Sequence, residues 1–218
     1  GGGLEIAMAC HYRVVADDPR IMLGLPESQV GLMPGGGGTQ RLPRLIGLAK
    51  ALPMILQGSS IGPAEALKAG LVHAVTPKDA LVDTAKAWLR EHGDPVQPWD
   101  KKGFKIPGGA GTLDANFRNT FMGASAMTRA IGFGNYPAPE RILATLYEGL
   151  QLPMDKALKV EANYTALLML DPVAGNMIRT MFINKGKADK LSARPADVPR
   201  MTYGKIAIIG AGTMGAGI

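Results

Sequence analysis

Apolar residues follow two different spacings in the first part of the chain. Residues 12–16 are rich in β-branched side chains and end at Asp17-Asp18-Pro19, which is typical of a strand and its turn. Residues 20–23 and 71–75 have a similar extended pattern. Runs of helix formers bounded by glycine or proline predict helices at residues 4–10, 39–46, 48–57, 63–69 and 79–91. Short strands mixed with helices predict an α/β or α+β domain.

The pattern changes after residue 92. Prolines and glycines make residues 93–112 a candidate linker, whose Lys101, Lys102 and Lys105 are either exposed or contacts for an anionic ligand. Beyond it, apolar residues at three- and four-residue spacing predict helices at residues 140–148, 155–170 and 173–185. This helical region shows no candidate for chemistry, and residues 194–199 form a second candidate linker.

The last residues carry a nucleotide-binding pattern. An apolar run at residues 205–209 leads into Gly210, Gly212 and Gly215 with the spacing G-x-G-x-x-G. After a strand, these glycines allow a tight turn and a close approach of the backbone to a pyrophosphate, so they are the candidate NAD-binding residues. The helix and the acidic residue that should follow are not in this sequence, so we expect no measurable NAD binding by the chain alone.

Composition narrows the possible partners. The chain of 218 residues has a net charge of +6 but an aromatic share of only 6% and no basic run interleaved with aromatics. We therefore expect a small anionic ligand, not a nucleic acid. No apolar run is long enough for a membrane-spanning helix. The single cysteine, Cys10, and the scattered histidines predict no metal site, and they weakly favour a reducing, cytoplasmic location.

Two glutamates are candidates for acid–base chemistry. Glu5 follows Gly1-Gly2-Gly3 in the first turn of the expected helix, and Glu27 follows Pro26. Spacing alone is equally well explained by two unrelated surface glutamates. The four glycines at 35–38, followed by Thr39 as the expected helix cap, could bring backbone N–H groups close to a ligand. Carboxylates beside such groups suit proton transfer next to a developing oxyanion.

Several segments together resemble a known family. Residues 1–10 (GGGLEIAMAC), 25–27 (LPE) and 34–42 (PGGGGTQRL) resemble the enoyl-CoA hydratase, or crotonase, signature, and residues 60–72 are similar to the segment that follows it. Residues 208–218 (IIGAGTMGAGI) look like the start of the 3-hydroxyacyl-CoA dehydrogenase nucleotide domain. Both signatures in one chain are similar to the multifunctional fatty-acid β-oxidation enzymes.

The resemblance implies three regions. Residues 1–92 would be the C-terminal part of a crotonase-like α/β domain, residues 93–202 a helix-rich linker, and residues 203–218 the first strand and glycine turn of a Rossmann domain. It also implies that the chain is a fragment, with other parts of the CoA and dehydrogenase sites lying outside it.

The resemblance also assigns roles. Gly2 would supply one N–H group of an oxyanion hole for the thioester carbonyl of a coenzyme A substrate. Glu5 would activate a water molecule for attack at the β-carbon, and Glu27 would deliver a proton to the α-carbon. The implied reaction is syn hydration of 2-enoyl-CoA, in an enzyme that also oxidises 3-hydroxyacyl-CoA with NAD.

Two alternatives remain open at this point. The same site could act as a Δ3-Δ2-enoyl-CoA isomerase, although the presence of both Glu5 and Glu27 favours hydration. The chain could also be a catalytically inert structural fragment. An acyl-CoA substrate is the expected partner, together with a homo-oligomer or a complex with a thiolase subunit.

Overall fold

The computed structural model describes residues 1–93, 95–195, 197–199 and 201–217. Asp94, Ala196, Arg200 and Ile218 lie outside the described residues. These residues fall in or next to the two expected linkers and at the end of the glycine turn, so these segments are described without them.

The first part of the chain is a mixture of short strands and helices, as predicted. Its elements are α1 (Gly2–Ala9), β1 (Val14–Ala16), β2 (Leu23–Gly24), a 3₁₀ helix (Pro26–Val30), α2 (Gly38–Ile46), α3 (Leu48–Leu56), β3 (Ser60–Ile61), α4 (Pro63–Ala69), β4 (Ala74–Thr76) and α5 (Leu81–Glu91). All five helices expected here are confirmed, and α3 continues through Pro53. The strand β3 was not expected, because two residues are too few to form a recognisable strand pattern in the sequence.

Two small sheets connect distant parts of this region. β1 pairs in parallel with β4, with Val15 opposite Val75, and β2 pairs antiparallel with β3. A methyl group at Gly24 would lie 2.8 Å from the Cβ of Ser60, so the second pairing needs glycine. β4 begins at Ala74, later than expected, because the buried Leu71 instead ends α4 by donating its N–H to Ala66.

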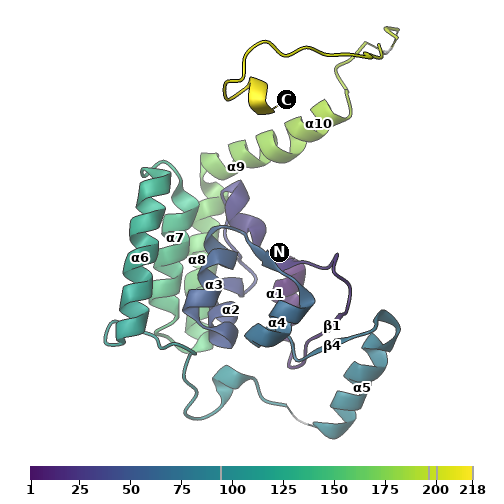
Figure 1. Cartoon of the computed structure of the whole chain (residues 1–218). Coiled ribbons are helices and arrows are strands. Elements are labelled where there is room, and N and C mark those ends of the chain that lie inside the picture. The colour runs from purple at the N-terminus through teal and green to yellow at the C-terminus, as the bar shows by residue number, and fades with distance from the viewer. Residues whose placement is uncertain (94, 196, 200, 218) are drawn as a thin grey trace.

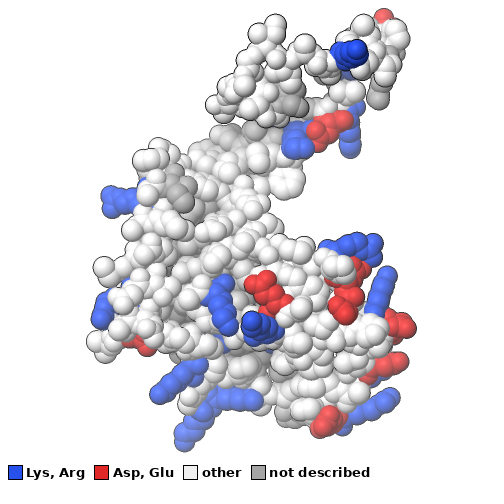
Figure 2. Space-filling view, in the orientation of Figure 1, with Lys and Arg blue, Asp and Glu red and all other residues white. Residues whose placement is uncertain are grey.

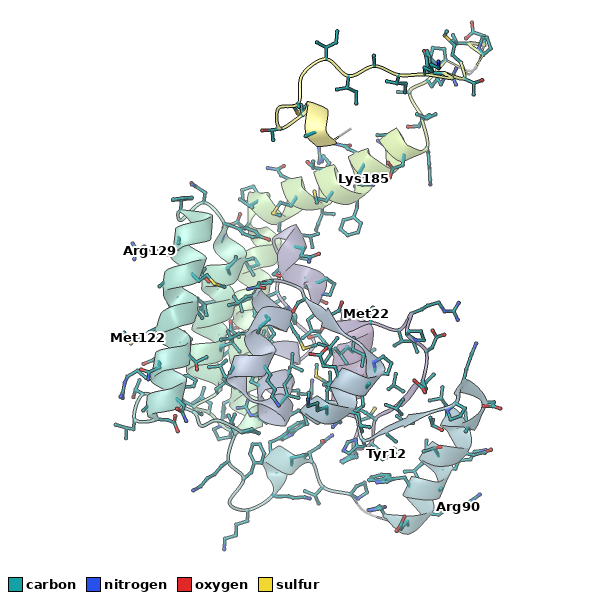
Figure 3. The ribbon with its side chains drawn as sticks, viewed as in Figure 1. Tyr12, Met22, Arg90, Met122, Arg129 and Lys185 are labelled. Atoms are coloured by element: carbon teal, nitrogen blue, oxygen red, sulfur yellow. The ribbon has the colours of Figure 1, made fainter. Side chains whose placement is uncertain are left out.

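The chain after residue 112 is helical. It contains α6 (Ala115–Gly132), α7 (Pro137–Gly149), α8 (Met154–Leu170), α9 (Pro172–Ile178), a π-helical segment (Arg179–Asn184) and α10 (Lys185–Asp189). Figure 1 shows α6, α7 and α8 side by side. α6 was not predicted as a separate helix. Its Asp114 cap accepts a 2.9 Å hydrogen bond from Phe117, and its Met122 is exposed and points away from the bundle with Arg129 (Figure 3).

One hydrophobic core joins the two parts of the chain. Leu42 of α2 and Ile55 of α3 belong to the same buried cluster as Phe117, Leu146 and Leu168 of the helical bundle. α2 contacts both α7 and α8. Residue 92 is therefore not a boundary of the core, and the helical region packs directly behind the elements that carry the candidate carboxylates.

α5 lies at the edge of this core. The Tyr12 side chain precedes β1 and lies beside α5 in Figure 3, where its ring stacks on Trp88 with the centroids 4.8 Å apart. Trp88 stacks in turn on His92, and Tyr12 on His73. This stack of four rings attaches α5 to the strands.

α8 and α9 meet at a sharp bend. Asp171 caps α9 by accepting a 2.8 Å hydrogen bond from the Val173 N–H, and Pro172 begins the new helix. Among the described residues, no single helix is long and apolar enough to cross a membrane. α8 and the following helix pass that test by length and composition only as a pair bent by 69°.

The structure does not show the expected strand at residues 205–209. These residues have no strand partner within the described ranges, and Ile206 and Ile209 are exposed. Figure 1 shows this segment, in yellow, beyond α10 and away from both sheets. A strand forms when its N–H and C=O groups pair with a neighbour, and an apolar β-branched sequence does not provide that neighbour.

Candidate active site

Glu5 is held by the glycine-rich loop that precedes α2. It lies in the first turn of α1 and is only 6% exposed. Its Oε1 accepts hydrogen bonds from the N–H groups of Gly36, at 2.8 Å, and Gly38, at 2.7 Å. The start of α2 therefore fixes the orientation of this carboxyl group, and the positive end of the helix dipole faces it.

The loop needs glycine to make this contact. A methyl group at Gly36 would lie 3.0 Å from Oε2 of Glu5, and one at Gly38 would lie 2.7 Å from Oε1. Gly37 has φ of +98°, a left-handed conformation in which side chains are strained. The glycines at 35–38 do bring N–H groups close to a partner, but that partner is the carboxyl group of Glu5 and not the ligand that we had expected.

Glu27 lies beside the N-terminus of α1. It is the second residue of the 3₁₀ helix Pro26–Val30, and a methyl group at Gly1 would lie 3.1 Å from its Oε1. Its Oε2 is buried and has no hydrogen-bond partner among the described residues. Burial raises the pKa of Glu27, and the nearby carboxyl group of Glu5 adds to that increase. A carboxyl group in this state is suited to carry and release a proton.

Gly2 completes this group of residues. It is the first residue of α1, so its N–H has no partner within the helix. Gly2 is exposed, and no atom lies within 4 Å of the place where a side chain would begin. The structure therefore places Gly2, Glu5 and Glu27 near the N-terminus of α1.

A third carboxyl group, Glu161 of α8, was missed by the sequence analysis. It is 1% exposed and accepts hydrogen bonds from the Gly37 N–H at 2.5 Å, the Thr39 N–H at 3.0 Å and the Thr39 hydroxyl. We had expected Thr39 to cap α2. It does not, because its side chain donates to Glu161. Burial raises the pKa of Glu161 to about 7, against the opposing effect of these hydrogen bonds.

The three loop lysines have different surroundings. Lys105 lines a cavity of about 380 Å³ with Arg44, Trp99 and Phe104. All three lysines are exposed, so Lys105 differs from Lys101 and Lys102 in lining this cavity. Figure 2 shows basic side chains at several places around this face, with acidic ones among them. Lys105 is therefore the loop lysine with a position suited to an anionic ligand.

The NAD-binding glycines do not form a complete site within the described residues. Gly210 and Gly215 approach each other in a turn, where a methyl group at Gly215 would clash with the carbonyl oxygen of Gly210. Gly212 is exposed, and only a 3₁₀ turn at Gly215–Gly217 follows. Among the described residues, neither a paired strand nor a full helix accompanies this turn.

Part of the chain matches a known protein family. Residues 1–95 match the family described as Enoyl-CoA hydratase/isomerase. A solved enoyl-CoA hydratase/isomerase from Pseudoalteromonas atlantica aligns with a TM-score of 0.52 and 18% identity, over 84% of this chain and 58% of that one. At this identity the likeness shows the fold alone, and it confirms the expected crotonase-like α/β fold.

Longer relatives match the whole chain. The fatty acid oxidation complex subunit alpha of Shewanella frigidimarina is 39% identical over 230 residues, and that of Shewanella amazonensis is 40% identical over 223 residues. Each match covers 100% of this chain, which spans 30% of the length of these relatives. The resemblance to both hydratases and multifunctional fatty-acid oxidation enzymes is thus confirmed.

The buried Glu161 predicts a pH-dependent stability. An unfolded glutamate titrates near the ordinary pKa of 4.5, whereas folded Glu161 has a pKa of about 7. Between these values the folded state binds more protons, so folding loses stability as the pH rises. We expect the unfolding free energy of the wild type, minus that of Glu161→Gln, to fall from pH 4.5 to pH 7 in urea titrations. A pH-independent difference would contradict the assigned pKa.

Proposed function

We propose, because residues 1–95 match the enoyl-CoA hydratase/isomerase family, that the protein hydrates 2-enoyl-CoA to 3-hydroxyacyl-CoA. The observation that carries the proposal is that Gly2 and Glu5 lie in the first turn of α1 and that Glu27 is close enough to Glu5 for the two carboxyl groups to interact. Hydration needs a base for water, an acid for carbon and a donor for the thioester oxygen, and these three residues supply one of each.

The reaction follows from the proposed roles. Glu5, oriented by Gly36 and Gly38, accepts a proton from a water molecule whose oxygen forms a bond to the β-carbon. The electron pair of the carbon–carbon double bond moves toward the thioester and forms an enolate. Glu27 then gives its proton to the α-carbon, which the raised pKa of this group favours. Water and proton arrive from the same side, so the addition is syn.

The N-terminus of α1 stabilises the intermediate. The enolate oxygen carries negative charge, and the Gly2 N–H is positioned to donate to it at the positive end of the α1 dipole. Loss of one such donor in other enzymes lowers kcat by roughly 100- to 1,000-fold. Gly2 is the donor that we assign from this chain.

We extend the proposal to fatty-acid β-oxidation because the relatives are named fatty acid oxidation complex subunit alpha. A subunit of that name supports a complex as the working form, with thiolase or a second copy as the predicted partner. Oxidation of the 3-hydroxyacyl product with NAD remains a prediction that depends on the turn of Gly210, Gly212 and Gly215. A cytoplasmic location remains a prediction as well.

Removing each carboxylate tests the proposed roles. We expect Glu5→Gln and Glu27→Gln to lower kcat for crotonyl-CoA hydration about 100-fold or more, which is the usual contribution of a positioned acid or base. The assay uses the protein at its natural length and follows the loss of enoyl absorbance. Glu65→Gln, which changes an exposed glutamate of α4, is the matched control and should keep the wild-type rate.

Each outcome of that assay separates the alternatives. Hydration that survives both substitutions would show that the assignment is wrong. A wild type that converts 3-enoyl-CoA to 2-enoyl-CoA without hydrating it would favour the isomerase. A wild type at its natural length that does neither would favour a structural role.

The proposed oxyanion donor can be removed with little change to the helix. Proline is accepted at the first position of a helix but has no N–H. We therefore expect Gly2→Pro to lower kcat roughly 100-fold or more, while Gly2→Ala keeps the N–H, meets open space and stays within about threefold. Circular dichroism should show both variants folded. Equal activity of the two variants would rule out the Gly2 N–H as the donor.

A further inference from the structure

We propose that Glu161 is a positioning residue that holds the glycine-rich loop, Gly35–Thr39, in the conformation that orients Glu5. This inference rests on the proposed hydration, in which Glu5 is the base. Glu161 comes from α8, in the helical region where the sequence shows no candidate for chemistry. Its role would be to act on Glu5 through the loop, without touching the substrate.

Consecutive N–H groups of the loop alternate between two carboxyl groups. Gly36 and Gly38 donate to Oε1 of Glu5. Gly37 and Thr39 donate to the two oxygens of Glu161. Because neighbouring N–H groups point to opposite sides, rotation of the peptide units on one side also moves the donors on the other. The loop is therefore fixed from both sides, by α1 and by α8.

Other residues on the same face of α8 also contact the loop. Leu158 and Thr165 lie three positions before and four after Glu161, so all three side chains share one face of the helix. A methyl group at Gly37 would lie 3.2 Å from Leu158, and one at Gly35 would lie 2.7 Å from Thr165. Packing by these two neighbours limits the loop to a position in which Glu161 meets its donors.

A buried carboxyl group is an expensive way to fill this space. Burial raises the pKa of Glu161 to about 7, which shows that its three hydrogen bonds do not fully offset the loss of water. An apolar side chain would avoid this cost, but it would leave the N–H groups of Gly37 and Thr39 without acceptors. The two carboxyl oxygens of Glu161 accept from the Gly37 and Thr39 N–H groups at once. This fixes which N–H groups of the loop face α8 and which face α1.

The consequence for catalysis is specific. Without Glu161, the Gly37 and Thr39 peptide units would turn toward other acceptors, and the N–H groups of Gly36 and Gly38 would leave Glu5. Misplacement of a reacting group by about 1 Å can cost about 100-fold in rate. In the proposed reaction Glu5 acts on water and does not hold the thioester, so the loss should fall on kcat and not on KM.

The experiment compares Glu161→Gln with Glu148→Gln in the protein at its natural length. Glu148 is a fitting control because it also contacts α8, through a 2.6 Å hydrogen bond from Tyr164, but within the described part of the chain it accepts no hydrogen bond from the loop. The side chain of the Glu161→Gln variant has one acceptor oxygen and one NH₂ donor group. Its NH₂ group would therefore face the N–H of Gly37 or Thr39, and two donors form no hydrogen bond. We expect Glu161→Gln to lower kcat for crotonyl-CoA by about 10- to 100-fold with KM within about threefold, and Glu148→Gln to change neither.

Hydrogen exchange at the amides of Gly36 and Gly38 provides a readout that needs no activity. Glu161→Gln should speed exchange at these two amides by at least about tenfold, without changing the amides of α7. If Glu161→Gln does not fold, Thr39→Val removes the hydroxyl that donates to Glu161, and also accepts from Gln40 Nε2 at 3.1 Å, and should produce a smaller change in the same direction.

The outcomes separate this inference from the proposed function. Inactive wild type with faster exchange in Glu161→Gln would refute hydration and retain the positioning role. If the wild type is active, three results for Glu161→Gln would each overturn the positioning role. These are an unchanged kcat, a rise in KM alone, and a fall in kcat without faster exchange at Gly36 and Gly38.

Discussion

Two carboxyl groups share the N–H groups of one glycine-rich loop, and the position of Glu5 depends on this sharing. Gly36 and Gly38 face Glu5, while Gly37 and Thr39 face Glu161. The loop can pass between them only because it has no side chains at 36–38. Its glycines serve the placement of a side chain from another helix more directly than they serve a ligand.

This arrangement explains why the helical bundle packs against the α/β elements. In the proposed hydration, the base Glu5 on α1 must stay in place while Glu27 and the N-terminus of α1 face the substrate. α2 carries the glycine loop, and the shared core of Leu42, Leu146 and Leu168 holds α2 against α7 and α8. The bundle is therefore part of the support of the site, whatever lies beyond α10 in a longer protein.

The sequence predicted much of the site but not its support. Glu5, Glu27 and the glycine loop stand in short, informative motifs, and the helices around them have clear patterns and stops. Glu161 could not be found, because its sequence neighbours look like an ordinary amphipathic helix and its partners lie 122 to 124 residues away. Thr39 was expected to cap its own helix because local hydrogen bonds are all that a sequence shows. Residues 205–209 have strand propensity, but a strand also needs a partner.

The most direct measurement is a crystal structure of the protein with acetoacetyl-CoA, a thioester that cannot be hydrated across a 2,3 double bond. If hydration takes place at the N-terminus of α1, the thioester oxygen should lie within about 3 Å of the Gly2 nitrogen. The β-carbon should then face Glu5 and Glu27. A thioester bound instead in the cavity of Arg44, Trp99 and Lys105, away from both glutamates, would contradict it.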